Sequence, residues 1–514
     1  MSSSTVLQKD DAEMSQPQAG SPGQSKRSTT RFVRDVFFAN LPLPFQKLRA
    51  YLWVIFFAKA LGPSGFGIWS LFQTTLLAAT VVTSLTQGNA MMRFLPANRT
   101  KEGIHQSFSS VLAATSIAAA LVALALAVCS NAFSKLLFHD YRGRTVLLIA
   151  AACLPLETWF EMMRGLLRAL RLNRIWAFFT LARQVPEAGI LILLVLWTHD
   201  PITLLVGSLF IGAISVLLGI LYLIRYQQVR FVSPNRSIWV KYLPYGLALI
   251  PGGLVSLLSL SADRYLVAYY LNLKEVGIYS VCFAVSALGF FFVGPLNDVL
   301  LPEMSALYDA GDWNQFYSRF SGVQKFVIGV AIGATAMLIT FPQQILHLLT
   351  THAFASGGPT LAILGLQGVF MSIVMLYIVL LYVRLRVWWS TVVWAGMGLL
   401  VIVFDVILLP RMGIIGAGWS QFLSSVAGAV GVIVLNWDIF RKTFRLIWIL
   451  QAGTALAGVW LLGHFWRFAT ISAAGAVFRL MAGCVVFLIG LAITKYLRMS
   501  ELLTLQRSFS KSRA

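Results

Sequence analysis

The chain consists mainly of apolar blocks that are separated by short polar segments. Most blocks provide about 20 residues, the length at which an α-helix crosses the hydrocarbon core of a bilayer. The pattern therefore predicts an all-α polytopic membrane protein with about 14 transmembrane helices. The expected spans cover residues 36–60, 66–90, 108–130, 145–168, 176–197, 202–224, 244–271, 276–298, 323–341, 358–383, 388–409, 414–436, 445–464 and 473–494. The longest expected outer loop, residues 342–359, is short, so we expect no soluble domain on either side.

A segment at the end of the first span recurs 210 residues later. Phe56–Leu71 and Leu266–Val281 share five identical residues at this one offset, and Trp69 stands opposite Tyr279. The identical pairs are Ala58/Ala268, Leu61/Leu271, Gly67/Gly277, Ile68/Ile278 and Ser70/Ser280. Internal repeats of this kind are typical of transporters, whose halves face each other across a pseudo-two-fold axis.

The repeat divides the chain into two lobes of six spans each. We expect a disordered basic tail at 1–35, an N-lobe at 36–224, a cytoplasmic linker at 225–243 and a C-lobe at 244–436. An additional pair of spans (437–494) and a second basic tail (495–514) complete the chain. Because each lobe has an even number of spans, both copies keep the same orientation, and the axis runs along the membrane normal.

Composition supports a membrane protein and fixes its expected orientation. The chain is 58% hydrophobic and 11% charged, with a mean hydropathy of +0.78, whereas soluble domains carry about 25% charged residues. With the N-terminus inside, 28 of the 40 Lys and Arg residues lie on cytoplasmic segments, 7 lie outside and 5 lie within spans. This asymmetry predicts that both termini are cytoplasmic. The net charge of +21 then reflects topology and contacts with anionic lipids, and it does not indicate nucleic-acid binding.

Several short motifs, in this order and spacing, resemble the multidrug/oligosaccharidyl-lipid/polysaccharide exporter superfamily, in particular its polysaccharide-unit flippase branch. They are AKALGPSGFGIWSLF after span 1, RFLP after span 2, MMRGLLRALRLNR ending span 4, SADRYLVAYYLNLKEVGIYS across spans 7 and 8, LLPEMS after span 8 and LLPRMGIIGAGWSQ between spans 11 and 12. The resemblance covers roughly residues 36–436. It implies a V-shaped, two-lobed fold with a central cavity that opens alternately to each side. It also implies a lipid-linked oligosaccharide, usually on undecaprenyl pyrophosphate, as cargo in the bacterial inner membrane.

Such a transporter needs polar groups at membrane depth, which are costly unless they face a cavity or a partner. Lys47 and Arg49 in span 1 are candidates for binding a pyrophosphate, because Arg offers a bidentate fork and Lys a point charge. If span 1 instead begins near Leu48, both side chains lie at the cytoplasmic interface. Span 1 also carries no acidic residue in its interior.

Spans 4 and 5 carry further charged residues at helical spacing. Glu157, Glu161, Arg164 and Arg168 fall on one face of span 4. They form either a hydrophilic stripe along the cavity or a self-neutralising ladder, and Glu157 lacks a cationic partner within one turn. In span 5, Arg183 and Glu187 either form a structural ion pair, or Arg183 joins Lys47 and Arg49 as a candidate for binding the pyrophosphate.

The remaining polar candidates are distributed over both lobes. Asp263 and Arg264 in span 7 are adjacent and point about 100° apart, so we expect at least one to face the cavity. Asp405 in span 11 is isolated and either binds a counter-ion or reaches the outer interface. Four further residues are helix-end polar groups or sugar ligands: Gln87, Asn89, Asn297 and Asp298.

Other classes of protein fit the sequence less well. A polytopic glycosyltransferase, polymerase or ligase would carry a large outer loop or an Asp-x-Asp site, and an ATPase would carry a phosphate loop; the sequence has none of these. The four cysteines and the histidines show no metal-ligand spacing, so we expect no cofactor and no enzymatic activity. A lipid II flippase and a multidrug antiporter coupled to H⁺ or Na⁺ remain alternatives within the same superfamily. A polysaccharide polymerase or glycosyltransferases are expected partners.

Overall fold

The computed structural model describes residues 41–97, 100–138, 142–465 and 473–496. All regular secondary structure in these residues is helical, and 13 helices are long and apolar enough to cross a membrane. The chain is therefore an all-α, multi-pass membrane protein, as the pattern predicts. One of the 13 candidates, Pro44–Thr83, covers the first two predicted spans together. The predicted N-terminal tail and nearly all of the C-terminal tail lie outside the described residues.

The helices form two bundles and a terminal pair. The first bundle, called the N-lobe here, contains α3 (Pro42–Thr83), α4 (Gln87–Phe94), α5 (Lys101–Val128), α6 (Ser130–Phe133), α7 (Arg142–Ala169), α8 (Asn173–Thr198) and α9 (Pro201–Arg225). The second, called the C-lobe, contains α11 (Leu273–Ser286), α12 (Val293–Asp309), α13 (Trp313–Thr340), α14 (Pro342–Leu349), α15 (Gly358–Val383), α16 (Val387–Met412), α17 (Ile414–Leu435) and α18 (Trp437–Thr443). Helix α10 (Arg236–Tyr270) joins the lobes, and α19 (Leu446–Phe465) with α20 (Ala473–Ile493) forms a terminal pair.

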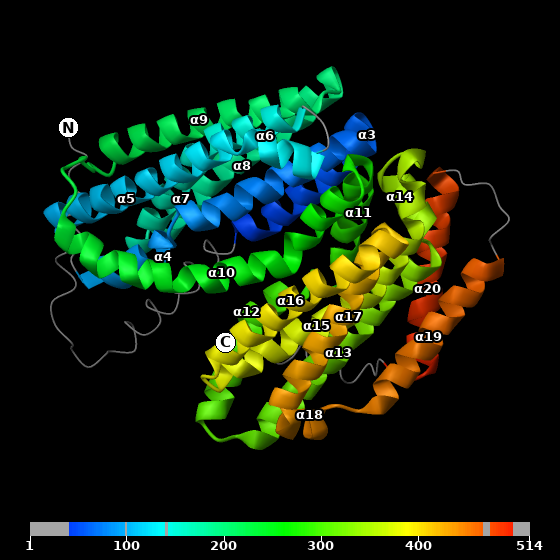
Figure 1. Ribbon diagram of the computed structural model, residues 1–514. Coiled ribbons are helices and arrows are strands. Elements are labelled where there is room, and N and C mark those ends of the chain that lie inside the picture. The colour runs from blue at the N-terminus through cyan, green and yellow to red at the C-terminus, as the bar shows by residue number, and fades with distance from the viewer. Residues whose placement is uncertain (1–40, 98–99, 139–141, 466–472, 497–514) are drawn as a thin grey trace, which may run out of the picture.

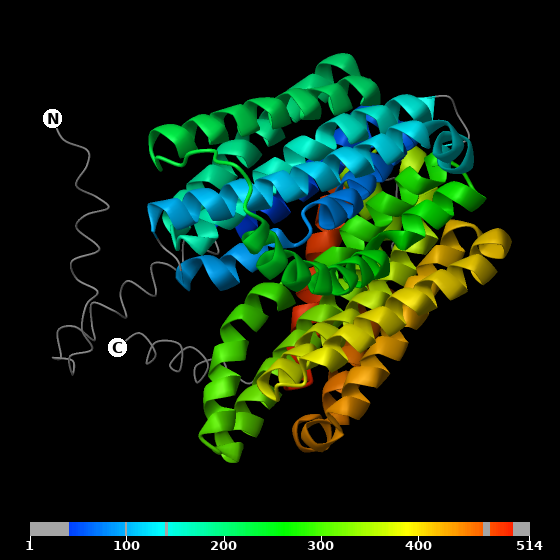
Figure 2. The ribbon, with the colours of Figure 1, turned by 60° about the vertical axis from the view of Figure 1, so that its left-hand side comes forward.

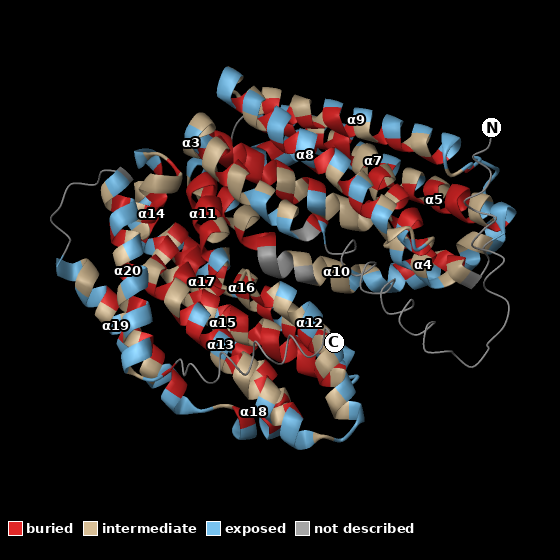
Figure 3. Ribbon diagram, turned by 180° about the vertical axis from the view of Figure 1, so that it is seen from behind, coloured by how far each residue is buried: buried red, intermediate tan, exposed pale blue. Residues whose placement is uncertain are grey.

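The two lobes touch along one side and diverge toward the other. Figures 1 and 2 both show the N-lobe and the C-lobe meeting near α3, α11 and α14 and spreading apart beyond them. Buried residues concentrate within each lobe, whereas the outward faces of α9, α19 and α20 are largely exposed (Figure 3). Exposed apolar faces of this kind suit helices that are surrounded by lipid.

The lobes meet where the two copies of the repeated segment cross. Helix α3 kinks at Gly62, whose φ of 66° is left-handed and favours glycine, and Pro63 restarts the helix. Beyond the kink, the identical residues of the repeat face each other. Gly67 packs against Gly277, and the Ser70 hydroxyl lies 2.7 Å from that of Ser280. This self-contact is what a two-fold relation between the copies predicts.

Glycine at both crossing positions permits direct backbone contact between α3 and α11. A Cβ atom on Gly67 would lie 2.0 Å from the carbonyl oxygen of Leu273, and one on Gly277 would lie 1.9 Å from that of Pro63. In the structure Gly67 lies inside a helix, and its role is close packing between the lobes.

Helix α10 belongs to both lobes. Its first half is bound to the N-lobe: the Trp239 indole donates to the carbonyl of Ser110 (2.7 Å), and the Thr86 hydroxyl donates to the carbonyl of Gly246 (2.5 Å). Its second half packs against α16 of the C-lobe. The expected boundary at residue 244 therefore falls within a continuous helix, which mechanically links the two bundles.

The second and eighth predicted spans are both interrupted. After α3, Leu85 and Thr86 adopt left-handed φ angles of 48° and 46°, and the span resumes as α4. After α11, a 3₁₀ turn (Ala287–Gly289) precedes α12. Irregular backbone at membrane depth occurs only where protein or a water-filled cavity can satisfy it. The first interruption adjoins α10, because the Thr86 hydroxyl donates to the carbonyl of Gly246, and the second packs against α13 and α15 within the C-lobe.

The terminal pair α19–α20 is packed tightly against α13 through small residues. A Cβ atom on Gly463 would lie 2.1 Å from Thr340 Cγ2, and one on Gly333 would lie 2.6 Å from the Phe487 ring. The Tyr496 hydroxyl also donates to the carbonyl of Lys325 at 2.5 Å. This pair is thus a firmly attached part of the C-lobe side of the molecule.

Candidate functional site

A cavity of about 330 Å³ opens between α3, α7 and α8 in the N-lobe. A second cavity of about 280 Å³ lies beside it toward α4. The two share lining residues, namely Leu77, Thr80, Glu161 and Arg164. Together they form one continuous region in the N-lobe, lined by charged and amide side chains among apolar ones, and we refer to this region as the N-lobe cavity.

Three ion pairs line the N-lobe cavity. Arg49 of α3 binds Glu187 of α8 at 2.5 Å. Arg183 of α8 binds Glu157 of α7. Arg164 binds Glu161 one turn away on α7 at 2.5 Å. Arg168 also lines the cavity, so four arginines face three glutamates and the lining carries a small positive charge.

Aromatic rings hold the arginine side chains from the opposite side. The guanidinium carbon of Arg49 lies 4.3 Å from the centre of the Trp53 ring, and that of Arg183 lies 4.4 Å from the Phe160 ring. Arg164 and Arg168 both lie over Trp176, at 5.5 and 4.7 Å. Stacking fixes the orientation of a guanidinium while leaving its N–H donors available in the ring plane.

Some polar atoms in the lining have no hydrogen-bond partner among the described residues. These atoms are Arg49 Nε, Arg164 Nε and Gln184 Oε1. Buried polar atoms are normally paired, and leaving one unpaired costs about 1–3 kcal/mol. Three such atoms around one cavity indicate a site built for water or a polar ligand.

The structure separates Lys47 from Arg49. Lys47 is exposed near the start of α3, and its Nζ lies 5.8 Å from the Phe291 ring of the C-lobe. Arg49 is 21% exposed and lines the N-lobe cavity. Of the two alternatives for span 1, the cavity therefore applies to Arg49, while Lys47 lies at the open face between the lobes.

The charged residues of spans 4 and 5 meet across helices. Glu157, which lacks a partner on its own helix, receives one from Arg183 of α8. The alternative of an Arg183–Glu187 pair within α8 is wrong, because each residue binds a partner on a neighbouring helix instead. Arg183 lines the N-lobe cavity together with Arg49, whereas Lys47, the third residue of the other alternative, is not part of this lining.

The helix-end polar residues divide into structural and cavity groups. The Gln87 amide donates to the carbonyl of Tyr242 at 3.4 Å, and the Asn297 amide donates to that of Met375 at 3.0 Å. Both therefore stabilise helix contacts. Asn89 lines the part of the N-lobe cavity near α4, whereas Asp298 is exposed.

A second polar cluster lies inside the C-lobe. Asp263 is fully buried and accepts hydrogen bonds from the Tyr279 hydroxyl and from the Gln421 amide, the latter at 3.0 Å. Arg264 also pairs with Asp263 at 3.6 Å. The expectation that these neighbours point apart is wrong, because the flexible Arg264 side chain turns back toward the carboxylate. Asp263 faces the interior of its own lobe.

Asp405 completes the C-lobe cluster. It is fully buried on α16 and lies close enough to Asp263 for their charges to repel each other. Neither of its carboxylate oxygens has a hydrogen-bond partner within the described residues, since the nearby Ser420 hydroxyl donates to the carbonyl of Gly416 (3.0 Å). Of the two alternatives for Asp405, the outer interface is wrong.

The two polar clusters arise from unlike residues at equivalent positions of the repeat. At the offset of 210 residues, Trp53 corresponds to Asp263 and Trp69 to Tyr279. The Trp53 and Trp69 rings pack edge-on with centres 5.3 Å apart, whereas Asp263 and Tyr279 form a hydrogen bond. The same helical frame thus carries an aromatic support under Arg49 in one lobe and a buried acid in the other.

Some lining residues lacked a recognisable signal in the sequence. Gln46, Gln73 and Gln184 line the N-lobe cavity, and Gln367 extends the C-lobe cluster by donating to Gln421 at 3.0 Å. Single amides within apolar spans carry no spacing pattern. Gln421 lies in the LLPRMGIIGAGWSQ motif and Tyr279 in the repeat, so the sequence offered a signal for these two residues.

Among the described residues, no group of three or more His, Cys, Asp or Glu could hold a metal ion.

The fold and the polar cavity within it define a membrane transporter with two helical lobes. Comparison with known families gives the same class. The family model of the polysaccharide biosynthesis protein matches residues 32–308, more than half of the chain. The chain belongs to this family. No curated protein sequence matches the chain.

Solved structures share the fold at low sequence identity. The lipid II flippase MurJ in an inward closed conformation has a TM-score of 0.69 and 16% identity, over 89% of this chain and 98% of that one. An inward-facing multidrug resistance MATE transporter has a TM-score of 0.61 and 15% identity, over 79% and 95%. A MATE protein in a bent conformation has a TM-score of 0.53 and 16% identity, over 80% and 95%. At these identities the likeness concerns the fold alone.

Proposed function

We propose that this chain flips a polyprenyl-pyrophosphate-linked oligosaccharide, a repeat unit for polysaccharide synthesis, from the cytoplasmic to the outer leaflet of the bacterial inner membrane. The observation that carries the proposal is the N-lobe cavity, in which ring-stacked arginines at membrane depth retain unpaired donors. A family whose model describes polysaccharide biosynthesis supports the same cargo.

The composition of the cavity suits a charged headgroup that carries sugars. Arg49 is held by Trp53 and Glu187 and still has a free Nε, so it can offer a donor fork to a phosphate oxygen. Neutral polar side chains surround it, including Gln46, Gln73, Thr80, Gln184 and Ser208. Amides and hydroxyls are suitable partners for sugar hydroxyl groups.

The ion pairs provide a way to couple binding to movement. A pyrophosphate that approaches Arg49 competes with Glu187 for the same guanidinium, because the two residues form an ion pair. Displacing Glu187 weakens the contact between α3 and α8 and leaves a buried carboxylate, which costs free energy unless the helices shift or the acid takes up a proton. Binding energy from the headgroup is thereby available to bias the two lobes toward a different arrangement.

The C-lobe cluster is a candidate for coupling transport to H⁺ or Na⁺. Two buried carboxylates that repel each other favour binding of a cation or a proton between them. Asp263 and Asp405 lie on α10 and α16, and α10 also contacts the N-lobe. Neutralising the pair therefore changes the packing of the helix that links the lobes.

Replacing Asp405 with asparagine is expected to abolish stimulation of flipping by an ion gradient. The isosteric amide keeps the volume of the side chain but cannot release a proton or supply negative charge. The measurement is the initial flipping rate in proteoliposomes with an imposed pH gradient, an imposed Na⁺ gradient or neither. The exposed Asp298, changed to asparagine, is the matched control and should respond like wild type. A D405N variant that responds fully to either gradient would overturn the role of this cluster.

The alternatives differ in the group that the cavity recognises. A multidrug antiporter binds an amphiphilic cation, for which the glutamates would be the partners. A lipid II flippase binds a pyrophosphate that carries a peptide-bearing disaccharide. Competition in a flipping assay separates the three: we expect inhibition by pyrophosphate-linked glycans, weak inhibition by lipid II and none by a lipophilic cation. Inhibition by the cation alone would contradict the proposal.

Several further partners belong to this proposal. Anionic lipids contact the basic cytoplasmic loops and both termini are cytoplasmic, as the charge distribution predicts. Glycosyltransferases supply the cargo on the inner side, and a polysaccharide polymerase consumes it on the outer side. Deleting the gene and complementing it with wild-type or variant chains, with surface glycan as the readout, tests the function in cells.

A further inference from the structure

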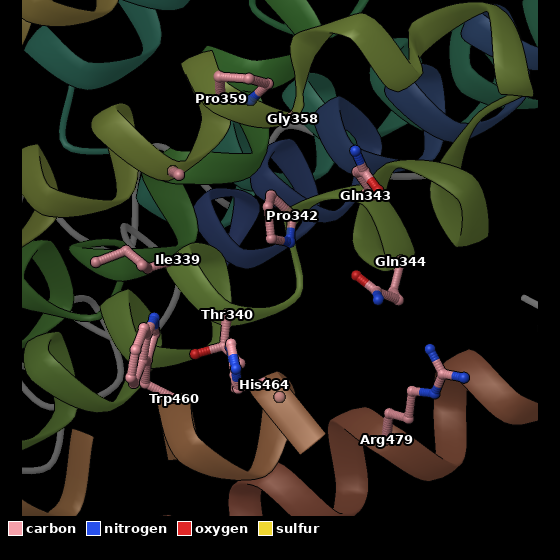
Figure 4. Close-up of a pocket in the computed structure, with 12 residues that line it drawn as sticks. Ile339, Thr340, Pro342, Gln343, Gln344, Gly358, Pro359, Trp460, His464 and Arg479 are labelled. Carbon is pink, nitrogen blue, oxygen red and sulfur yellow. The ribbon is translucent and has the colours of Figure 1, made fainter. Parts of the chain in front are cut away.

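A separate cleft of about 500 Å³ lies far from the N-lobe cavity, between the C-lobe and the terminal pair α19–α20. Its lining comes from the end of α13, from α14, from the start of α15 and from the facing ends of α19 and α20. Figure 4 shows Gln343 and Gln344 on one side and His464 and Arg479 on the other. With the N-terminus on the cytoplasmic side, these helix ends lie at the outer face of the membrane.

The cleft is rich in hydrogen-bond donors and has a positive character. Arg479 is only 6% exposed, and a further contact within the protein holds it in place. Two glutamine amides and a histidine ring share the lining. None of the lining residues is acidic, and the five helices that supply them contain no Asp or Glu at all. A positive lining at an interface attracts anions, which fit best where fixed donors can bind the oxygen atoms.

A buried hydroxyl in the lining also lacks a partner. The Oγ1 atom of Thr340, at the end of α13, has no hydrogen-bond partner among the described residues. Thr340 and His464 both line the cleft (Figure 4). A buried hydroxyl normally finds a partner, so this atom is an independent sign of a polar ligand.

The other half of the lining is apolar. Ile339, Pro342, Pro359 and Trp460 contribute to the walls. Trp460 is 46% exposed and stacks on His464 with ring centres 5.7 Å apart. Tryptophan at the level of lipid headgroups is typical of membrane interfaces. A cleft with donors at one side and apolar walls at the other suits an amphiphile better than a free anion.

We propose that this cleft binds the phosphate of a lipid headgroup from the outer leaflet. The phosphate lies against Arg479, with Gln344 and Thr340 as further donors, and the lipid chains follow the apolar faces of α19 and α20. The glycine contacts that fasten this pair to α13 keep the donors in a fixed arrangement. The site is distinct from the proposed headgroup site in the N-lobe. The choice of the outer leaflet follows from the predicted orientation of the chain in the membrane.

The test is lipid binding to the purified full-length protein, measured by native mass spectrometry and by the shift in thermal unfolding. Phosphatidylglycerol is compared with diacylglycerol of the same chains, with inorganic phosphate and with a polyprenyl phosphate. We expect both phosphate-bearing lipids to bind at least about tenfold more tightly than diacylglycerol, the scale of one charge-assisted hydrogen bond. The tighter binder of the two, phosphatidylglycerol or the polyprenyl phosphate, identifies the class of lipid whose phosphate occupies the cleft.

Variants locate the binding in this cleft. Arg479→Gln should weaken phosphatidylglycerol binding about tenfold, while Arg411→Gln, an exposed arginine on the same side at the end of α16, should have no effect. Gln344→Ala serves as a milder second variant if Arg479→Gln does not fold. Equal binding by wild type, R479Q and Q344A would overturn the proposal, as would equal binding of diacylglycerol. Stabilisation by inorganic phosphate at the affinity of the lipid would show a soluble-anion site instead.

Discussion

Changing Arg49 to glutamine is expected to reduce glycan export by about tenfold or more, whereas the same change at Lys47 should leave export near the wild-type level. Arg49 lines the N-lobe cavity, stacks on Trp53 and keeps a free donor. A hydrogen bond to a charged group contributes about 1.5–3 kcal/mol, which corresponds to about 10- to 100-fold in affinity. Lys47 is exposed two residues earlier on the same helix. Surface glycan at matched protein levels is the measurement.

A second variant distinguishes a substrate contact from a purely structural ion pair. Arg49→Gln alone leaves Glu187 buried without its partner, so a loss of export could reflect instability. In the double variant Arg49→Gln/Glu187→Gln both charges are removed, and stability should recover because an uncompensated buried charge no longer remains. We expect export to stay low in this double variant. Restoration of export together with stability would show that Arg49 acts only by holding α3 to α8.

Changing Gly67 or Gly277 to alanine is expected to abolish transport and to lower the thermal stability of the protein. In either variant the new Cβ atom would meet a backbone carbonyl oxygen at about 2 Å, so the two helices must separate. Overpacking of this kind typically costs about 1–3 kcal/mol. The lobes are in contact at this crossing, so separating the two helices changes how one lobe sits against the other. Thermal unfolding and export, measured on the same variants, provide the readouts.

Gly431 provides the matched control for the crossing glycines. It lies within α17 and has no atom within 4 Å of an added Cβ. Alanine there should be neutral or slightly stabilising, because alanine is a better helix former than glycine. If Gly67→Ala behaved like Gly431→Ala in both stability and export, close packing at the crossing would not be required for transport.

The apolar pattern predicted the membrane class because the bilayer imposes length and hydropathy on every span. The sequence also showed the repeat, and two of its identical pairs, Gly67 with Gly277 and Ser70 with Ser280, lie in contact in the structure. The pattern could not show the interruptions in spans 2 and 8. Left-handed residues such as Leu85 and Thr86 follow from tertiary contacts with α10, and neither residue type indicates a break.

The sequence identified charged residues that the structure places in the N-lobe cavity, but it did not identify their partners. Charged residues are rare within apolar spans, and this rarity is why the sequence pointed to Arg49, Glu157, Arg183 and Glu187. Spacing along one helix then suggested an Arg183–Glu187 pair, although both residues bind across helices. Which neighbouring helix faces a side chain depends on how the bundle packs, and one sequence does not contain that information.

The most direct test of the account is flipping of a pyrophosphate-linked oligosaccharide by the purified full-length protein in proteoliposomes. A glycosidase added outside reports how much of the lipid-linked sugar crosses to the outer leaflet. We predict rapid, protein-dependent exposure of the sugar in wild type and in Lys47→Gln, and a rate near the protein-free background in Arg49→Gln/Glu187→Gln. A wild-type rate no higher than the protein-free background would contradict the proposed function. Equal flipping rates in wild type and in the double variant would contradict the proposed site.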